Sequence, residues 1–336
     1  MAQRLPPRKS GFWRSQDFRA RLYQALAIAG VVAVVWFLAH NTLQNMALRG
    51  IQSGFSFLGD PAGFGIGESL FPFDSAQPYW QAFAVGFSNT LRVAFLGIIL
   101  TTVLGTLLGV GRFSRNALVR GVCYAYVEVF RNVPVLLQLL MWYLLFTQVL
   151  PAAAEAWTLG PLFLSKGGLS FPIPVWPTDG VPFSFDYPVK GAFAIEHGGS
   201  LTPEFLAMLL GLTAYTAAFV AEVVRAGIQS VDRGQREAAV ALGLNSRQSM
   251  RLVLLPQALR VIIPPLTNQF LNLTKNSSLA VAIGYPDVVS IANTALNQTG
   301  RAVECIAIVM AVYLCTSLAT ALLMHGYNRR AAIQER

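Results

Sequence analysis

Charged residues are scarce in this sequence of 336 residues. Only 12% of the residues are charged and 54% are hydrophobic, whereas soluble globular domains carry about 25% charged residues. This shortage excludes an ordinary soluble domain. The net charge of +9 could indicate a nucleic-acid-binding protein, but the basic residues flank apolar runs instead of forming one patch with interleaved aromatic residues. The composition therefore predicts an integral membrane protein.

Cysteine and histidine are also rare, and their positions do not suggest a disulfide or a metal site. The six residues are Cys123, Cys305, Cys315, His40, His197 and His325. The cysteines are far apart in apolar segments, which does not support a disulfide framework or a cysteine metal site. No histidine has a partner at metal-ligand spacing. We expect no metal site, and the absence of a nucleophile with a base or of a metal cluster argues against a membrane enzyme.

The sequence also lacks a phosphate-binding loop. The motif GxxxxGK[ST] requires a Gly-Lys pair, and none of the four lysines follows a glycine. If ATP drives this protein, another chain must hydrolyse it. We therefore expect a non-catalytic chain with no cofactor of its own.

Long apolar runs are abundant. A spanning helix needs roughly 20 mostly apolar residues, and the qualifying segments lie near residues 22–39, 83–110, 133–150, 205–224, 258–283 and 303–325. The first could pass for a signal peptide, but Phe37 stands where a cleavage site ending at Ala39 needs a small residue. We expect an all-α integral membrane protein with about six transmembrane helices.

The basic residues predict the orientation. Nineteen of the 25 lysines and arginines lie in the two terminal tails and in the regions 111–131 and 225–260. Because Lys and Arg collect on the cytoplasmic side of short loops, we expect both termini and these regions to be cytoplasmic.

Two long segments are then extracytoplasmic insertions, residues 41–82 and 151–204. The second contains eight of the eighteen prolines, which favours turns and extended chain over helix. Its aromatic content predicts an ordered insertion. A passive surface loop and a docking surface for a partner both remain open.

The cytoplasmic loop over residues 227–256 reads like part of a soluble protein. A run of good helix formers ends at Gly243, which suits the left-handed position that terminates a helix. Asn245 or Ser246 can cap a second short helix, which we expect to stop before Pro256. Composition alone leaves a membrane-surface helix open.

The stretch EAAVALG, followed by nine residues and VLLP, resembles the EAA signature of ABC importer permeases. The matching residues are Glu237, Ala238, Ala239, Gly243, Val253, Leu255 and Pro256. The stretches YVEVFRNVPVLLQL, AAFVAEVVRAGIQSVDRGQREAA and LPQALRVIIPPLTNQFLNLTKNSSLAVAIG are similar to stretches of the histidine, glutamine and general L-amino-acid permeases. Asn276 departs from that group, which commonly has Asp at this position.

This resemblance implies a type I ABC importer permease fold in the bacterial inner membrane and amino-acid transport into the cytoplasm. It implies that the 227–256 loop docks onto a separate ATPase, which binds ATP and Mg, through Glu237, Ala238, Ala239, Gly243 and Pro256. Further implied partners are a second homologous permease or another copy of this chain and an extracytoplasmic binding protein, with membrane lipid around the helices. A secondary amino-acid transporter without an ATPase is the alternative, although no convincing internal repeat is visible.

We expect three parts along the chain. Residues 1–82 hold a cytoplasmic tail, the first transmembrane helix and an extracytoplasmic segment. Residues 83–328 form the transport domain, which includes the 151–204 insertion and the 227–256 loop. Residues 329–336 form a cytoplasmic tail.

A polar stripe crosses the fifth apolar run. It comprises Asn268, Asn272, Lys275 and Asn276, with Thr267 and Thr274 nearby. The spacing i, i+4, i+7 and i+8 places the first four on one helix face. Since a central Lys costs roughly 2.5–3.5 kcal/mol at membrane depth, we expect this face to look inward and to line the substrate pathway. Lys275 would pair with an acidic group or attract the substrate carboxylate. A structural hydrogen-bonding seam is the alternative.

Two charge pairs and one pair of glycines complete the candidate residues. The charge pairs are Glu128 with Arg131 and Glu222 with Arg225. Residues three apart share a helix face, so each pair can form near the cytoplasmic surface, as a structural pair or as a gating contact. Gly105 and Gly109 form a small-residue face that permits close helix packing.

Overall fold

The structure is a computed structural model that describes residues 16–48, 50, 53–176, 184–191 and 193–331. The chain divides into two compact units, one of Met1–Phe55 with Gly300–Glu304 and one of Ser56–Thr299 with Cys305–Arg336. The described residues contain five helices long and apolar enough to cross a membrane, or six if one bent pair counts as a single span. The prediction of about six spans is confirmed.

The first unit contains α1 (Gln16–Leu48), which includes the first predicted span. Within this unit the Gly54 amide donates to Glu304 Oε1 at 2.5 Å, and Arg301 Nη1 donates to the Gly54 carbonyl at 3.0 Å. These bonds fix the segment that follows α1 to residues 300–304. The basic residues of the tails that lie outside the described residues are Arg4, Arg8, Lys9, Arg14 and Arg336.

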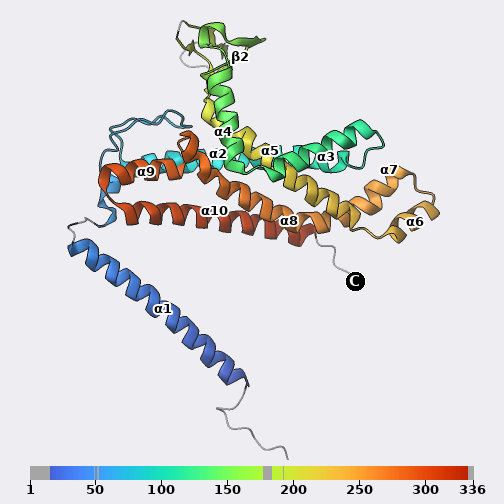
Figure 1. Ribbon diagram of the computed structural model, residues 1–336, viewed down its shortest axis with the longest axis horizontal. Coiled ribbons are helices and arrows are strands. Elements are labelled where there is room, and N and C mark those ends of the chain that lie inside the picture. Colours follow the sequence, from blue (N-terminus) through green and yellow to red (C-terminus); the bar gives the residue numbers. More distant parts are fainter. Residues whose placement is uncertain (1–15, 49, 51–52, 177–183, 192, 332–336) are drawn as a thin grey trace, which may run out of the picture. The chain divides into compact units, whose positions relative to one another are not determined.

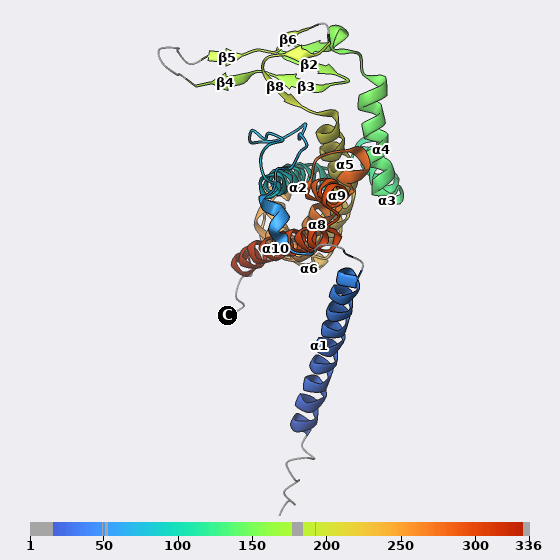
Figure 2. The same cartoon turned by 90° about the vertical axis from the view of Figure 1, so that its left-hand side faces the viewer.

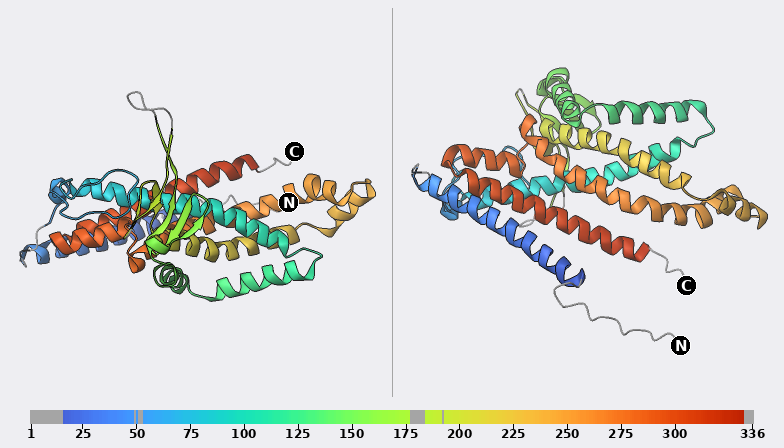
Figure 3. Two further views of the ribbon diagram at one scale, coloured as in Figure 1. Left: turned by 90° about the horizontal axis from the view of Figure 1, so that it is seen from above. Right: turned by 60° about the horizontal axis from the view of Figure 1, so that its bottom comes forward.

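Three helices form the centre of the second unit, α2 (Tyr79–Gly111), α5 (Pro203–Gln229) and α8 (Leu255–Asn276). Figure 1 and Figure 3 show them running beside one another, with α10 (Ala302–Ala331) along α8. Four further short helices are η2 (Phe55–Gly59), η4 (Ala153–Glu155), η6 (Ser277–Ile283) and α9 (Val288–Thr299).

Glycines mark the closest approach of α2 to α5. A side-chain carbon at Gly105 would lie 2.5 Å from Val220 Cγ1, and one at Gly109 would lie 2.7 Å from the Ala221 carbonyl oxygen. Both distances are shorter than van der Waals contact, so no side chain fits at either position without moving α5. The predicted small-residue packing face is confirmed.

A sharp bend precedes the helix at the third predicted span. The sequence predicted one spanning helix over residues 133–150, but α4 (Val135–Leu144) and the π-helical turn η3 (Leu145–Val149) meet α3 (Ala117–Asn132) at 104°. Pro134 has no N–H and disfavours helical geometry in Val133, which is extended at φ −97° and ψ 127°. Gln138 Nε2 donates to the carbonyls of Phe130 and Val133, each at 2.9 Å, so the break leaves these groups satisfied.

The 151–204 insertion is ordered, as predicted, wherever the structure describes it. One antiparallel sheet has the strand order β1-β2-β3-β8, and β4-β5 and β6-β7 form two further pairs (Figure 2). The strands are β1 (Trp157–Leu159), β2 (Leu162–Ser165), β3 (Gly168–Phe171), β4 (Ile173–Val175), β5 (Ser184–Asp186), β6 (Val189–Lys190), β7 (Ile195–Glu196) and β8 (Gly199–Leu201). The chain is therefore mostly helical with a small β insertion. Proline interrupts a helix but is tolerated at edge strands and at the start of a strand, so this proline-rich insertion forms short strands.

A buried ion pair joins the segment before α2 to two helices. Arg92 of α2 donates to Glu68 Oε1 at 2.6 Å and lies 4.2 Å above the Phe205 ring. The other Glu68 oxygen accepts the Thr202 amide at 3.1 Å. An arginine within an apolar helix is unfavourable unless it is paired. Glu68 supplies the counterion from a segment that precedes the spanning helix.

A second buried carboxylate lies near this ion pair, at the start of α9. Asp287 accepts hydrogen bonds from the Ser290 amide at 2.8 Å and from the Tyr313 hydroxyl at 3.3 Å. Its burial away from water raises the pKa of Asp287 to about 7, although these hydrogen bonds act in the opposite direction. The Val288 amide donates to Thr90 of α2 at 3.2 Å, so this turn is also fixed to the central bundle.

Candidate functional site

The 227–256 loop begins with a short, well-terminated helix. α6 (Arg233–Ala241) is capped by Asp232, whose side chain accepts the Gly234 amide at 2.6 Å. Its other end is a Schellman motif, because the Leu244 amide donates to the Ala239 carbonyl and the Gly243 amide to the Val240 carbonyl. Gly243 has φ +75°. The predicted left-handed glycine at the end of a helix is confirmed.

The second half of the loop differs from the prediction in its C-terminal end. Asn245 caps α7 (Ser246–Ser249), and it exchanges reciprocal hydrogen bonds with Gln248. The helix was expected to stop before Pro256, but it continues through the π-helical turn η5 (Met250–Leu254) into α8. The Leu255 amide donates to the Met250 carbonyl, five residues back. Pro256, which has no N–H, therefore falls in the first turn of α8, where proline is tolerated.

Part of the loop is exposed, and the exposed residues near its Gly243 turn include apolar side chains. Glu237, Ala238 and Gly243 are exposed, whereas Ala239 is buried at 2% exposure. Val240 and Leu242 are 65% and 80% exposed. Sequence reasoning missed these two residues, although exposed apolar residues beside a helix end are a signal for a partner surface.

The base of the loop is held rigidly. A side-chain carbon at Gly227 would lie 2.2 Å from Ile262, so α5 and α8 meet closely just before the loop begins. An apolar cluster joins the same two helices; its buried members are Val220, Val224, Ile228, Ala258 and Ile262. Gln257 also donates to Gln235 of α6 at 3.1 Å. α5 and α8 are therefore packed together at the base of the loop, and this hydrogen bond joins α6 to α8.

Of the two predicted charge pairs, one is an ion pair among the residues that the structure describes. Arg225 Nε donates to Glu222 at 3.0 Å, which confirms that pair. Glu222 also accepts Arg112 Nη1 of α2 at 2.5 Å. This second partner lies 110 residues away in the chain, so helix spacing gave no signal for it.

For the second predicted pair, Glu128 with Arg131, the described residues show other neighbours. Arg131 lies 5.3 Å from the ring centroid of Phe219 on α5, and the Glu128 carbonyl accepts Asn132 Nδ2 at 2.6 Å. Residue spacing places both charges on one face of α3, but an aromatic ring of a neighbouring helix lies within reach of the guanidinium.

A polar pocket of about 310 Å³ lies between α5 and α8. It is lined by Tyr215, Thr216, Phe219, Gln269, Asn272 and Asn276. The Thr216 hydroxyl is buried and has no hydrogen-bond partner among the described residues. The structure therefore brings Asn272 and Asn276 together with α5. Sequence reasoning missed Gln269, although the spacing i, i+3 and i+7 of Gln269, Asn272 and Asn276 indicates a common face.

The other residues of the predicted stripe do not line this pocket. Asn268 and Lys275 are exposed on α8. Thr267 and Thr274 lie on a different face, and their hydroxyls donate to the carbonyls of Ile263 and Phe270 on their own helix. Neither threonine lines this pocket.

Comparisons with known proteins agree on one family. The family described as "Binding-protein-dependent transport system inner membrane component" matches residues 79–332. The chain is 42% identical to the general L-amino acid transport system permease protein AapQ of Rhizobium johnstonii, over 95% of this chain and 94% of that protein. It is 33% identical to the glutamate/aspartate import permease protein GltJ of Escherichia coli, over 74% of this chain and 86% of that protein.

Solved structures show the same fold. A crystal structure of an amino acid ABC transporter with histidines matches with a TM-score of 0.56 and 28% identity, over 75% of this chain and 95% of that chain. An inward-facing structure of the MetNI methionine ABC transporter matches with a TM-score of 0.51 and 18% identity, over 76% of this chain and 98% of that chain. The second likeness shows the fold alone.

Proposed function

Because the chain belongs to the family of binding-protein-dependent transport system inner membrane components, we propose that it is the permease subunit of an ABC importer for amino acids. The observation that carries this proposal is the exposed 227–256 loop, whose helix ends in the Gly243 turn and whose base is fixed to α5 and α8. The names of the relatives, among them a general L-amino acid permease and a glutamate/aspartate permease, support amino acids as the substrate class.

The 227–256 loop is the docking site for a separate ATPase. Glu237, Ala238 and Gly243 offer a surface that a partner can approach closely, and Val240 and Leu242 give it apolar anchors. Ala239 and Pro256 support the loop from inside instead of touching the partner. ATP and Mg are bound by the ATPase, whose closure moves α6 and, through the base of the loop, α5 and α8. The Arg112–Glu222–Arg225 cluster joins α2 to the same end of α5.

The substrate pathway follows the polar face of α8. Asn272, Asn276 and Gln269 offer amide groups, and the unpartnered Thr216 hydroxyl completes the pocket. An amino acid needs donors for its carboxylate and acceptors for its ammonium group, and side-chain amides supply both. Asn268 and Lys275 are exposed in this chain and face a second permease, either a homologue or another copy. An extracytoplasmic binding protein delivers the amino acid.

Both termini and the 227–256 loop are cytoplasmic in this proposal. In a cysteine-free background, single cysteines at Asn116 and Asn245 should be shielded from an impermeant thiol reagent in intact cells, and a cysteine at Thr158 should react. All three positions are exposed on the chain, so access is decided by the membrane. Thr178, a further outward position, lies outside the described residues. Labelling of the Asn245 site from outside would overturn this orientation.

Co-purification tests the proposed function directly. The tagged chain, extracted gently from its native membrane, should retain an ATPase subunit at a fixed stoichiometry, and amino-acid uptake into vesicles should require internal ATP and the binding protein. The matched control is the same extraction of a chain with the 227–256 loop replaced by a flexible linker, which should lose the ATPase. If the ATPase is absent and uptake follows an ion gradient, the chain is a secondary transporter and the proposal fails.

A further inference from the structure

The residues that line the polar pocket between α5 and α8 carry no formal charge. They are two aromatic residues, one threonine and three side-chain amides: Tyr215, Phe219, Thr216, Gln269, Asn272 and Asn276. Arg131 stacks on Phe219 and Lys275 precedes Asn276, but both basic residues are exposed and neither lines the pocket. A ligand in this pocket therefore meets hydrogen-bonding groups and aromatic rings, but no ion among its lining residues.

One group in the pocket is ready to bond a ligand. Thr216 is 2% exposed, and its hydroxyl is buried without a hydrogen-bond partner among the described residues. Threonine in a helix can donate to the carbonyl four residues back, as Thr102 and Thr274 do in this chain. A buried hydroxyl without a partner is unfavourable. A polar ligand that lies against α5 can satisfy it.

The two walls of the pocket differ in chemistry. On α5 the ring centroids of Tyr215 and Phe219 lie 4.9 Å apart, which gives an aromatic surface. On α8 the side chains of Gln269, Asn272 and Asn276 line the pocket, and each amide offers both donors and an acceptor. An amino acid with an uncharged side chain carries one ammonium and one carboxylate group, whose charges cancel. Such a zwitterion matches a wall of amides that has no net charge.

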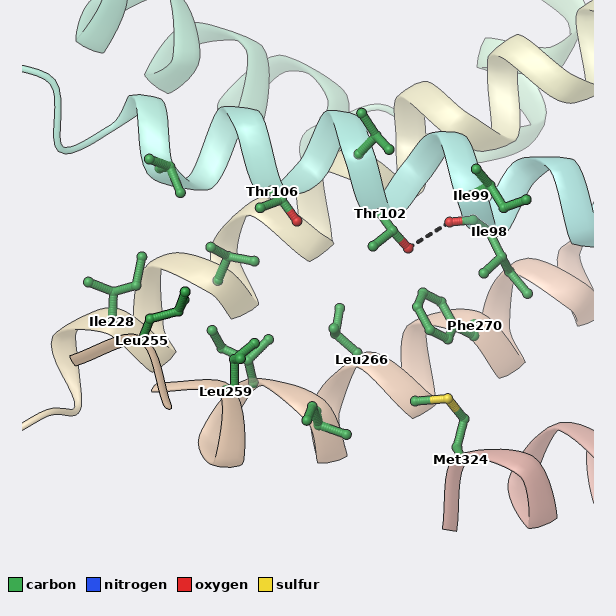
Figure 4. Close-up of a pocket in the computed structure, with 15 residues that line it drawn as sticks. Ile98, Ile99, Thr102, Thr106, Ile228, Leu255, Leu259, Leu266, Phe270 and Met324 are labelled. Carbon is green, nitrogen blue, oxygen red and sulfur yellow. Dashed lines mark hydrogen bonds between the residues drawn. The ribbon is translucent and has the colours of Figure 1, made fainter. Parts of the chain in front are cut away.

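A different face of α8 borders a larger cavity with little polar surface. This cavity of about 540 Å³ lies between α8 and α2, and Figure 4 shows Ile98 of α2 and Leu266 of α8 pointing into it. Apart from two threonines its lining residues are apolar. One of these hydroxyls, that of Thr102, donates to the Ile98 carbonyl at 2.7 Å, as the dashed line in Figure 4 shows. The amide face of α8 is therefore the better match for a zwitterion.

We propose that the polar pocket favours amino acids whose side chain is uncharged, and that position 276 sets this preference. The inference rests on the proposed function, because it takes the pocket as part of the substrate pathway. A net charge is costly to move from water into a site between membrane-spanning helices unless a counterion is present. Glutamate and arginine carry a net charge, whereas glutamine does not. Asn276 is half-buried and lines the pocket, so a charge introduced there acts on the ligand with less screening than in water.

Binding of amino acids to the purified importer complex, without the binding protein, tests this preference. Labelled glutamine is bound to the complex and displaced by unlabelled glutamate or arginine, which gives a relative Kd for each. The wild-type complex should bind glutamine more tightly than either. Asn276→Asp should strengthen arginine relative to glutamate roughly tenfold, and Asn276→Lys should shift the same ratio roughly tenfold the other way, because the introduced charge attracts one ligand and repels the other.

Two controls separate charge in the pocket from a general effect on the structure. Asn297→Asp introduces the same charge at an exposed position of α9 that does not line the pocket, and it should leave the ratio unchanged. Thr216→Val removes an uncharged hydroxyl and should weaken all three amino acids alike. If Asn276→Asp does not assemble, Asn272→Asp places the charge on an exposed residue that lines the pocket, and it should shift the ratio in the same direction.

ATP-driven uptake with the binding protein present is recorded in parallel. Equal Kd values of the three amino acids for the wild-type complex, or no saturable binding of glutamine, would overturn the proposed preference. The same ratio in Asn276→Asp and Asn276→Lys, or an equal shift in Asn297→Asp, would remove position 276 from it. If uptake by the wild-type complex persists in these cases, the proposed transport function stands, whereas loss of ATP dependence in the wild type would contradict that function itself.

Discussion

Replacing Gly243 with valine is expected to lower ATP-driven amino-acid uptake strongly while the chain still inserts into the membrane. Gly243 ends α6 at φ +75° with no neighbouring atom within 4 Å of a side-chain position. The strain of valine is therefore in the backbone, where the left-handed conformation costs about 1–2 kcal/mol per residue. The turn would open, Val240 and Leu242 would change direction, and uptake should fall roughly tenfold or more.

The measurement is uptake into vesicles beside ATPase binding by the extracted complex. Gly243→Asn is the matched control, because asparagine tolerates the left-handed region, and it should retain most of the uptake. Gly284 also has a positive φ, +78°, but lies outside the loop, so Gly284→Val separates a general effect of backbone strain on folding from loss of coupling. Uptake at the wild-type rate in the valine variant would remove the 227–256 loop from the coupling mechanism.

Substitution of the polar pocket should change transport without changing assembly. Asn272→Leu removes an amide that lines the pocket, and Asn268→Leu removes one from the same helix that does not line it; both side chains are exposed in the isolated chain. A site that loses a buried hydrogen bond to its substrate commonly loses about 1–3 kcal/mol, so uptake through Asn272→Leu should fall roughly 10- to 100-fold. The effect of Asn268→Leu should be smaller, or should alter the preference among amino acids.

Competition among labelled amino acids provides the measurement, with complex assembly and nucleotide binding recorded in parallel. Gln269→Leu should behave like Asn272→Leu, because both side chains line the pocket. Thr267→Val is the matched control, since this hydroxyl is bonded to its own helix. Normal transport in both asparagine variants would show that the polar face is not the pathway. Failure of both variants to assemble would favour a structural seam between helices.

The sequence predicts those features of the fold that depend on local chemistry. The lengths of the apolar runs predicted the membrane spans. The run of helix formers followed by Gly243 predicted where α6 ends. The spacing of Gly105 and Gly109 predicted that α2 packs closely against another helix, but it did not predict that this helix is α5. Each of these depends on residues within a few turns of one another. For the same reason Asn245 was one of the two candidate caps of the second helix.

Features that depend on distant segments were not predictable in this way. Proline at position 134 indicates a break, but the 104° bend depends on how α4 packs and on Gln138, which satisfies the carbonyls at the break. The second partner of Glu222 comes from α2, and the counterion of Arg92 comes from the segment before that helix. In the candidate site, Lys275 and Asn268 were recognised as polar residues of one face, but their exposure could not be inferred from spacing.

The π-helical turn η5 determines the direction in which the 227–256 loop points. An α-helix advances each residue by about 100° around its axis, because one turn contains 3.6 residues. In η5 the Leu255 amide bonds to the fifth preceding residue instead of the fourth, so this turn contains one extra residue. The side chains of α7 are therefore rotated by about 100° relative to the positions that an unbroken α-helix continuing from α8 would give them. Deleting a single residue between Gly243 and Pro256 would turn the exposed tip of α6 roughly a quarter of a revolution away from its docking direction. The length of this stretch therefore determines the direction of α6, whatever residues the stretch contains.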